Sequence, residues 1–433
     1  MTESTTSATT TTHSQSTRVS NPVPKSIRRQ RGLAYLNFRN LGDKYEHYAP
    51  WNPSHSIVSV DTNEDTWNET LHRLQFNILP PLLTQIVTLA KFLTPSELQD
   101  DTDGSKLKLI VETQSGLDQS LDQILSIAAG IKPKLPSSPA RTDDNDLRGL
   151  KEFRRQGVLL PLRSLNDELG EICEFGASTM RDLKKGTQET SLWYRIRQLN
   201  RRGLLFELII SATSSIDRLN KWISRHEFIN IQNHWGLELS AYDDKIADLT
   251  KQIHRTNRHS ESEDGSAVFE DPLATLNKHT VPLAQALIPV IKLCRLFFKT
   301  LAKDGLKKTP LKLFTDMSSH QLETLSESPR YIGCDLSEII TLIEDADENG
   351  EYETIESISE TIDKIIHRFD STLLLVVIYI IPLIPNSISS PNHLQDYLVA
   401  WNNLFLMATQ NFVHVAESYK ASSESSDTHD DDE

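Results

Sequence analysis

The chain has 433 residues, and its 60 Asp and Glu outnumber its 45 Lys and Arg to give a formal net charge of −15. This balance disfavours nonspecific attraction of the whole molecule to nucleic acid or to anionic lipid. The three cysteines are few and widely spaced, which argues against a disulfide framework or a zinc site and favours a reducing compartment.

Residues 1–60 are predicted to be a disordered tail. The first twenty are rich in Ser and Thr, a composition that cannot bury a core. A small basic cluster follows at Lys25, Arg28, Arg29 and Arg31, and it is either a nuclear-import signal or an ordinary charged segment. No basic start followed by an apolar core precedes it. We therefore expect no conventional secretory signal and a cytoplasmic location, with the nucleus as the alternative.

Residues 61–256 are predicted to form a first helical bundle, because apolar residues recur there at helical spacing. Thr66 is a candidate cap for a helix whose apolar face begins at Trp67. The segment Thr94-Pro95-Ser96-Glu97 is a capping box with proline at the first helical position. Further helices are expected over residues 107–129, 162–184, 190–228 and 236–256.

The polar run of residues 257–271 is the predicted linker to a second helical bundle at 272–421, and residues 422–433 form an acidic tail. Apolar stripes with spacings of three and four cover residues 283–301, 355–369 and 394–419 of the second bundle. Such stripes predict coiled-coil-like helices that pack nearly parallel or antiparallel. Pro289 is expected to bend or interrupt the first of them.

The twelve-residue apolar run 373–384 would cover about 18 Å as a helix, against roughly 30 Å of hydrocarbon in a bilayer. It is predicted to be a buried core helix, with a buried strand as the alternative and no membrane span. Together the patterns predict an all-α protein of two packed antiparallel helical bundles with disordered N- and C-terminal tails.

The stretch D-A-D-E-N-G-E-Y-E-T-I-E at 345–356 fits the calcium-loop pattern at every specified position. Its oxygen ligands would come from Asp345, Asp347, Asn349, Glu351, Glu353 and Glu356. The flanking apolar stripes are displaced, however, and one residue of displacement rotates a helix face by about 100°. An acidic connection between two antiparallel helices is therefore the preferred interpretation. No cofactor is expected, and calcium is the one alternative.

A basic patch with neighbouring aromatic residues lies between residues 148 and 202. It consists of Arg148, Lys151, Arg154, Arg155, Arg195, Arg197, Arg201 and Arg202. Phosphate or RNA binding needs such a cluster on one face. A solvated, salt-bridged helix face produces the same pattern and is preferred.

No catalytic motif emerges from the sequence. Phosphate-binding and dinucleotide-binding glycine loops, the metalloprotease H-E-x-x-H pattern and the G-x-S-x-G nucleophile pattern are all missing from it. His254 and His259 are five residues apart, which does not align two imidazoles on one helix face. The sequence therefore predicts that the protein is not an enzyme.

Two segments resemble an uncharacterised, lineage-expanded, all-helical protein family of rust fungi. They are V-I-K-L-C-R-L-F-F-K-T-L at 290–301 and S-P-N-H-L-Q-D-Y-L-V-A-W-N-N at 390–403. The similarity covers most of the chain outside the tails, but its motifs are packing patterns. It implies a helical fold and a fungal origin, and it carries no activity. In architecture alone the layout is also similar to vinculin/α-catenin-type bundles and to helical cyclin-D-binding proteins.

We therefore predict a non-catalytic interaction or scaffold protein whose partner is another protein rather than nucleic acid. The first alternative is a calcium-responsive regulator that acts through residues 345–356. The second is a phosphate- or RNA-binding protein that acts through the basic patch.

Overall fold

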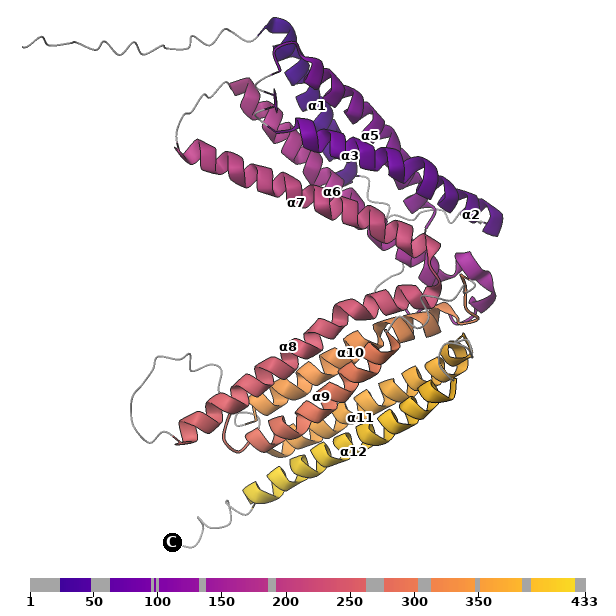
Figure 1. Ribbon diagram of the computed structural model, residues 1–433, viewed down its shortest axis with the longest axis vertical. Helices are drawn as coiled ribbons and strands as arrows, with labels where there is room; N and C mark the ends of the chain where they lie inside the picture. The colour runs from indigo at the N-terminus through magenta and orange to yellow at the C-terminus, as the bar shows by residue number, and fades with distance from the viewer. Residues whose placement is uncertain are drawn as a thin grey trace, which may run out of the picture. The chain divides into compact units, whose positions relative to one another are not determined.

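The computed structural model describes residues 24–47, 63–94, 97–98, 101–131, 138–185, 192–261, 276–302, 313–346, 351–383 and 391–424. Every regular element in these ranges is helical, which confirms the predicted all-α class (Figure 1). The predicted linker lies largely outside the described residues, as do most of the N-terminal tail and the end of the acidic tail.

The chain divides into two compact units. Unit 1 comprises Met1–Ala49, Ile78–Leu125 and Ser164–Ser214. It contains the helices α1 (Lys25–His47) and α3 (Leu79–Phe92) and most of α5 (Ser105–Ala129). It also contains the later part of α6 (Glu152–Lys185) and the earlier part of α7 (Leu192–Ser224). Unit 2 is made of the remaining residues.

Helix α1 corrects the prediction of a disordered tail over residues 1–60. Ile27, Ala34, Phe38 and Leu41 lie on one face of α1 and are buried in unit 1. Phe38 packs so closely on α6 that a Cβ at Gly176 would lie 2.8 Å from its ring. The composition around this segment concealed the face, because a Ser/Thr-rich stretch and the basic cluster at 25–31 precede most of it.

Polar contacts between helices set the register of unit 1. The Asn37 side-chain amide on α1 donates to the Gln114 side-chain oxygen on α5 at 3.2 Å. The Ser120 hydroxyl on α5 donates to the Gln85 side-chain oxygen on α3 at 3.2 Å. Helix α5 therefore packs against both α1 and α3.

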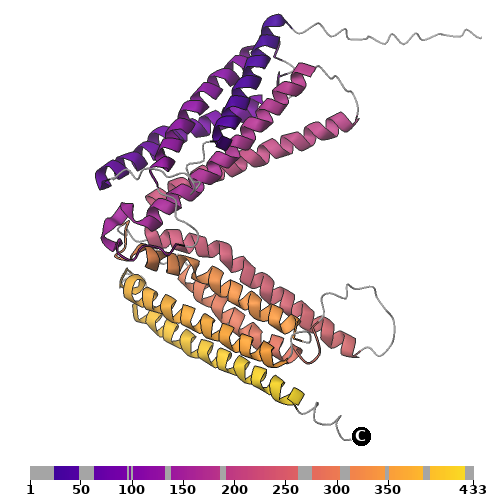
Figure 2. The same cartoon turned by 180° about the vertical axis from the view of Figure 1, so that it is seen from behind.

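Unit 2 contains five long helices among the described residues, and they lie alongside one another (Figures 1 and 2). They are α8 (Glu227–Glu261), α9 (Val281–Leu301), α10 (Ser319–Glu344), α11 (Glu351–Leu375) and α12 (Pro391–Glu424). Shorter elements complete the unit: α2 (Glu64–Arg73), most of the π-helical turn η1 (Leu74–Ile78), and the 3₁₀ turn η2 (Asn145–Leu150). Helix α11 continues into a π-helical turn, η4 (Val376–Ile380), and a 3₁₀ turn, η5 (Ile381–Leu383).

The core of unit 2 is built from the predicted apolar stripes. On α12 the residues Leu398, Trp401, Phe405 and Phe412 are buried, which confirms that these aromatic residues pack in the core. Helix α9 continues through Pro289. At the start of α10 the Ser318 side chain and the Gln321 side chain form a reciprocal capping box.

Helix α8 belongs to unit 2, and this grouping differs from the predicted boundary. The sequence assigned residues 227–256 to the first bundle because the most polar run follows them. In the structure α8 packs along α9 and α10. Trp235 on α8, for example, donates from Nε1 to the carbonyl oxygen of Leu325 at 3.0 Å. The boundary between the two units therefore does not fall at this polar run.

By length and composition alone, the segments Val281–Leu301 and Thr354–Leu383 are apolar enough to cross a membrane. Phe297, Phe298 and Phe369 on these segments pack in the core of unit 2, so a membrane protein is not indicated. The run 373–384 is also less buried than predicted. Leu374, Val377 and Ile378 are exposed, whereas Val376 and Ile380 are buried.

Candidate functional site

The feature of unit 2 that packing does not explain is a stretch of sequence almost without charge. From Ser371 to Ala416 the only charged residue is Asp396, although 24% of the whole chain is charged. At that rate about eleven charged residues would fall in these 46 positions. An exposed helix face is normally charged or polar, and depletion of charge is typical of the centre of a protein interface.

One exposed part of this stretch lies where α11 passes into η4. Leu374, Val377 and Ile378 are 59%, 47% and 50% exposed. We call these residues the η4 patch. The extra residue of a π-helical turn changes the direction of the side chains, and such turns are frequent at functional sites. Here the turn buries Val376 and Ile380 and leaves Val377 and Ile378 in solvent.

The second part is the outer face of α12. Val399, Asn403, Met407, Gln410 and His414 are all exposed and are spaced by four, four, three and four residues. This spacing places them on one face of the helix. We call this face the α12 seam, and Val399 and Met407, 63% and 66% exposed, are its large apolar members.

The opposite face of α12 fixes the direction of the seam. Trp401 donates from Nε1 to the carbonyl oxygen of Leu293 on α9 at 2.9 Å. Its ring stacks on Phe405, with centroids 5.0 Å apart and an interplanar angle of 11°. The Thr300 hydroxyl on α9 donates to the Tyr397 hydroxyl at 3.0 Å. These contacts hold α12 against α9, so the seam points away from the core.

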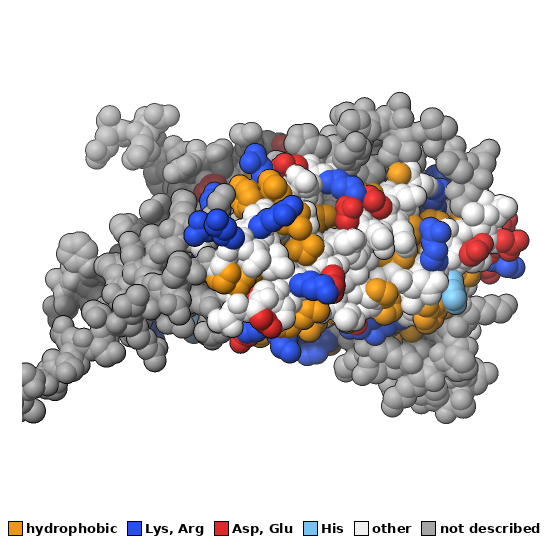
Figure 3. Space-filling view, turned by 90° about the horizontal axis from the view of Figure 1, so that it is seen from above, with side chains coloured by type: hydrophobic (Ala, Val, Ile, Leu, Met, Phe, Trp, Pro, Cys, Tyr) orange, Lys and Arg blue, Asp and Glu red, His pale blue; other side chains and the backbone are white. Residues whose placement is uncertain are grey.

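Exposed apolar side chains also occur elsewhere in the described residues, for example Phe76 and Val87. On the face seen in Figure 3, small hydrophobic groups alternate with Lys, Arg, Asp and Glu side chains. Scattered apolar residues of this kind are normal on soluble proteins. The η4 patch and the α12 seam differ in lying within a 46-residue stretch that holds one charged residue.

A buried ion pair lies at another place in unit 2. Lys151 Nζ is 3.2 Å from Glu227 Oε2, and both side chains are fully buried. Lys151 also donates to the carbonyl oxygen of Thr315 at 2.6 Å. The amide and the hydroxyl of Thr315 each donate to the same Glu227 oxygen at 2.7 Å. Burial also lowers the pKa of the neighbouring His226 to about 4, so that imidazole is neutral at pH 7.

Asp144 joins the starts of two helices beside this pair. Its carboxylate accepts from the backbone amide and the hydroxyl of Ser319 at 2.7 and 2.6 Å, where α10 begins. It also accepts from the amide of Glu152 at 2.9 Å, where α6 begins. A carboxylate at a helix N-terminus satisfies otherwise unpaired amides and interacts favourably with the helix dipole. Asp144 therefore has a structural role.

The structure corrects part of the predicted basic patch. Lys151 is a member of the buried ion pair with Glu227. Arg154 is 5% exposed, and its guanidinium donates to two backbone carbonyl oxygens at the end of α7, both at 3.1 Å. Arg155 donates to a backbone carbonyl oxygen at 2.6 Å. Arg148 alone of these four is well exposed. Lys151 and Arg154 are thus not available to an external phosphate.

The remaining members of the basic patch lie in α7. Arg201 pairs with Asp182 of α6 and lies over the ring of Phe175, 5.2 Å from its centroid. The side chains of Arg195 and Arg197 lie outside the described residues. Binding of phosphate or RNA through Arg202 and these residues stays a prediction.

The predicted calcium loop connects α10 and α11. Asp347 and Asn349 lie outside the described residues, as do the side chains of Glu351 and Glu353. Asp345 is the C-cap of α10, and Glu356 is an exposed residue of α11, which already begins at Glu351. In the described part of the chain no group of three or more His, Cys, Asp or Glu residues forms a metal site. Calcium binding at 345–356 therefore stays a prediction.

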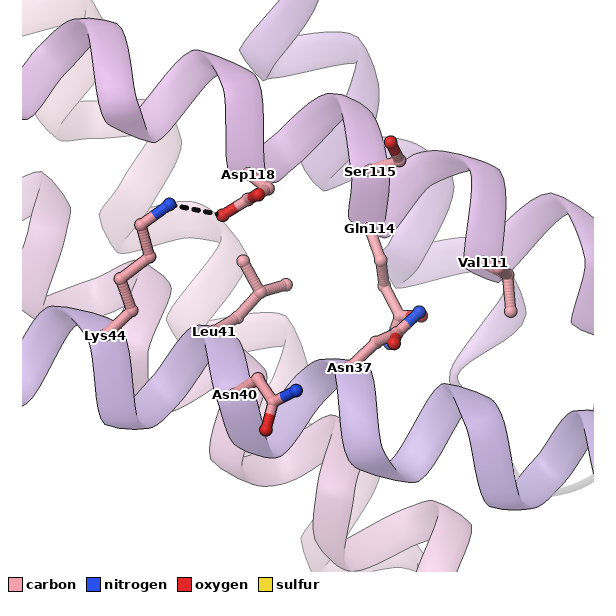
Figure 4. Close-up of a pocket in the computed structure, with 8 residues that line it drawn as sticks. All are labelled: Asn37, Asn40, Leu41, Lys44, Val111, Gln114, Ser115 and Asp118. Atoms are coloured by element: carbon pink, nitrogen blue, oxygen red, sulfur yellow. Dashed lines mark hydrogen bonds and ion pairs between the residues drawn. The ribbon is translucent and has the colours of Figure 1, made fainter.

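A cavity of about 430 Å³ lies between α1 and α5 in unit 1 (Figure 4). Lys44 on its rim lies 2.7 Å from Asp118 and 2.6 Å from Asp122. The Gln114 amide inside it donates to the carbonyl oxygen of Ala34 at 2.8 Å. Lys44 is thus paired with two carboxylates, and Gln114 is bonded to Asn37 and to the backbone of α1. We read the cavity as a polar groove between two helices.

An ion pair between α8 and α10 makes the stability of unit 2 depend on pH. His234 Nε2 is 3.3 Å from Glu327 Oε1, and this contact raises the pKa of His234. Because the pKa of His234 is higher in the folded state than in the unfolded state, the protonated imidazole stabilises the fold. This contribution is complete at pH values below the unfolded-state pKa of 6.5, and it is lost as the pH rises through the folded-state pKa.

Replacing His234 with Gln is therefore expected to destabilise the protein more at pH 5.5 than at pH 8.5. The difference should be at most about 1 kcal/mol, because both partners are partly exposed. Urea unfolding at the two pH values measures it, with the exposed His254→Gln as the control. An equal loss at both pH values would contradict this assignment.

Comparison with protein families divides the chain in two. Residues 67–224 match a model described as a domain of unknown function (DUF8723), and residues 226–414 match another (DUF8721). Neither a curated protein nor a solved structure matches the chain. The boundary between the two matches falls at Arg225, between α7 and α8. The two matches are consecutive, and the second spans α8 to α11 and most of α12.

Proposed function

We propose that the protein is a non-catalytic interaction protein that binds another protein through the η4 patch and the α12 seam. One observation carries the proposal: several large apolar side chains are exposed within a stretch of 46 residues that holds a single charged residue. Full burial of one such side chain contributes about 1.5–3 kcal/mol. Several of them on adjoining helices therefore provide the apolar centre that a stable interface needs.

The buried ionisable groups support a non-catalytic role. Glu227 is occupied by Lys151 and Thr315, and Asp144 by the starts of two helices. A general acid or base must reach the proton that it transfers. Groups enclosed in this way stabilise the fold and do not act on a substrate. We extend the proposal to a cytoplasmic location and to membership of the rust-fungus family, which the packing patterns at 290–301 and 390–403 support.

Replacing Ile378 with Glu is expected to abolish capture of the partner. The substitution places a charge in the centre of the η4 patch, and a charge that is buried without a counter-charge costs several kcal/mol of binding. The measurement is affinity capture from a cell extract with the full chain, followed by mass spectrometry that quantifies each captured protein.

Leu160→Glu is the matched control, because Leu160 is 64% exposed and lies on α6, outside residues 371–416. The proposal is supported if the captured amount of one protein falls at least about tenfold with Ile378→Glu and does not change with Leu160→Glu. Equal capture by all three proteins would exclude the η4 patch as a binding surface.

A further inference from the structure

We propose that the second matched region, residues 226–414, recognises a segment of the first, residues 141–153, at the place where α8 and α10 begin. Glu227, Thr315 and Ser319 form this site, and we call them the helix-start site. Its ligand is a polypeptide segment that carries an aspartate and a lysine in a fixed order, and the chain supplies that segment itself. The inference goes beyond the proposed function and depends on neither the η4 patch nor the α12 seam.

The compact unit that contains the helix-start site crosses the boundary between the two family matches. Unit 2 takes Ser126–Arg163 from the first matched region, and it contains every residue of the second. A domain that folds alone has its own hydrophobic core. Phe153 of the segment, however, packs against the core that is built mainly by α8 to α12. The second matched region is therefore completed by a segment from the first.

The lysine of the segment meets a carboxylate of the site. Lys151 Nζ lies 3.2 Å from Glu227 Oε2, and both side chains are fully buried. Lys151 also donates to the carbonyl oxygen of Thr315 at 2.6 Å. A segment without a cation at this position would leave Glu227 buried and charged without a counter-charge. The cost of that unpaired charge makes the site discriminate against such a segment.

The aspartate of the segment meets the start of a helix. Asp144 accepts from the amide and the hydroxyl of Ser319 at 2.7 and 2.6 Å, where α10 begins. The Ser319 hydroxyl in turn accepts from the Phe153 amide at 2.8 Å. The anion of the segment thus meets a positive helix N-terminus, whereas its cation meets an anion of the site. A segment bound in the reverse direction would place Asp144 against Glu227, so the charges fix its direction.

An apolar anchor accompanies these polar contacts. The Phe153 ring lies 5.3 Å from the Trp222 ring, and a Cβ at Gly149 would lie 3.7 Å from the Phe314 ring. Specific interfaces combine a buried apolar anchor with paired polar groups around it. The segment 141–153 offers both, and this combination is what distinguishes recognition from contact between two apolar faces.

Cutting the chain between the two matched regions tests the inference. A flexible loop with a protease site is inserted after Ser224, which is exposed, and the purified full chain is cut there. We expect the two pieces to stay together at about 1 µM in sedimentation velocity. Asp144→Asn combined with Lys151→Met should weaken their association at least about tenfold.

Arg201→Met is the matched control for this experiment, because Arg201 pairs with Asp182 and both residues lie in the first piece. It should leave the association unchanged, and circular dichroism before cutting confirms that each variant is folded. If the double variant does not fold, Asp144→Asn alone takes its place and should still weaken the association severalfold. Separation of the pieces of the unsubstituted chain, or an association that these substitutions do not weaken, overturns the inference.

A peptide tests whether the segment is recognised as a separate ligand. A labelled peptide of residues 138–157 is titrated against the uncut double variant and against the unsubstituted chain, and fluorescence anisotropy measures binding. The double variant should bind at least about tenfold more tightly, because the site of the unsubstituted chain is occupied by its own segment. The same peptide with Asp144→Asn and Lys151→Met should not bind. Equal binding of the two peptides, or binding of neither, contradicts recognition of this segment.

Discussion

Replacing Lys151 with Met is expected to lower the free energy of unfolding by about 3–5 kcal/mol. The substitution leaves Glu227 charged and fully buried without its counter-charge. It also leaves the Thr315 carbonyl oxygen without the lysine that donates to it. Removing one partner of a buried pair is costly because the desolvation of the other charge is no longer offset.

Urea unfolding followed by circular dichroism measures this loss. Lys364→Met is the control, because Lys364 is 3.8 Å from Glu338 in a half-exposed pair and should change stability by less than about 0.5 kcal/mol. The double variant Lys151→Met with Glu227→Gln should recover much of the loss, since neither position of the pair then carries a charge and the glutamine oxygen still accepts from Thr315. A loss below about 1 kcal/mol for Lys151→Met would mean that the pair contributes little.

Replacing Phe369 with Ala is expected to cost about 3–5 kcal/mol, because it opens a cavity where α9, α11 and α12 meet. The Phe369 ring lies 5.2 Å from the Phe297 ring, 4.9 Å from the Trp401 ring and 4.8 Å from the Phe405 ring. Aromatic pairs at these distances add to the effect of apolar burial.

The same unfolding experiment measures the effect of Phe369→Ala. Phe206→Ala is the matched control, because Phe206 on α7 is 65% exposed and should change stability by less than about 0.5 kcal/mol. Equal stability of the two variants would show that the aromatic cluster does not hold the three helices together.

The helices of unit 2 were predictable because helical spacing is local. The 3.6-residue repeat of a helix is enough to place Leu398, Trp401, Phe405 and Phe412 on one face of α12. These residues are buried, as predicted. Helix α1 was not predicted because most of its apolar face follows a Ser/Thr-rich stretch and a basic cluster, which together resemble a disordered tail. The charge-poor stretch from 371 to 416 is also evident from the sequence alone. It was not interpreted as exposed, because the run 373–384 was predicted to be buried.

The sequence by itself determined that the chain is helical, where most helices lie, and that charge is missing near the C-terminal end. Only the tertiary structure decided that α8 joins the C-terminal helices, that Lys151 meets Glu227 across 76 residues of sequence, and which side of α12 faces solvent. The physical reason is the range of the interactions. Helix periodicity follows from neighbours within one or two turns, whereas the partner of a buried charge is chosen by the packing of helices far apart in the chain.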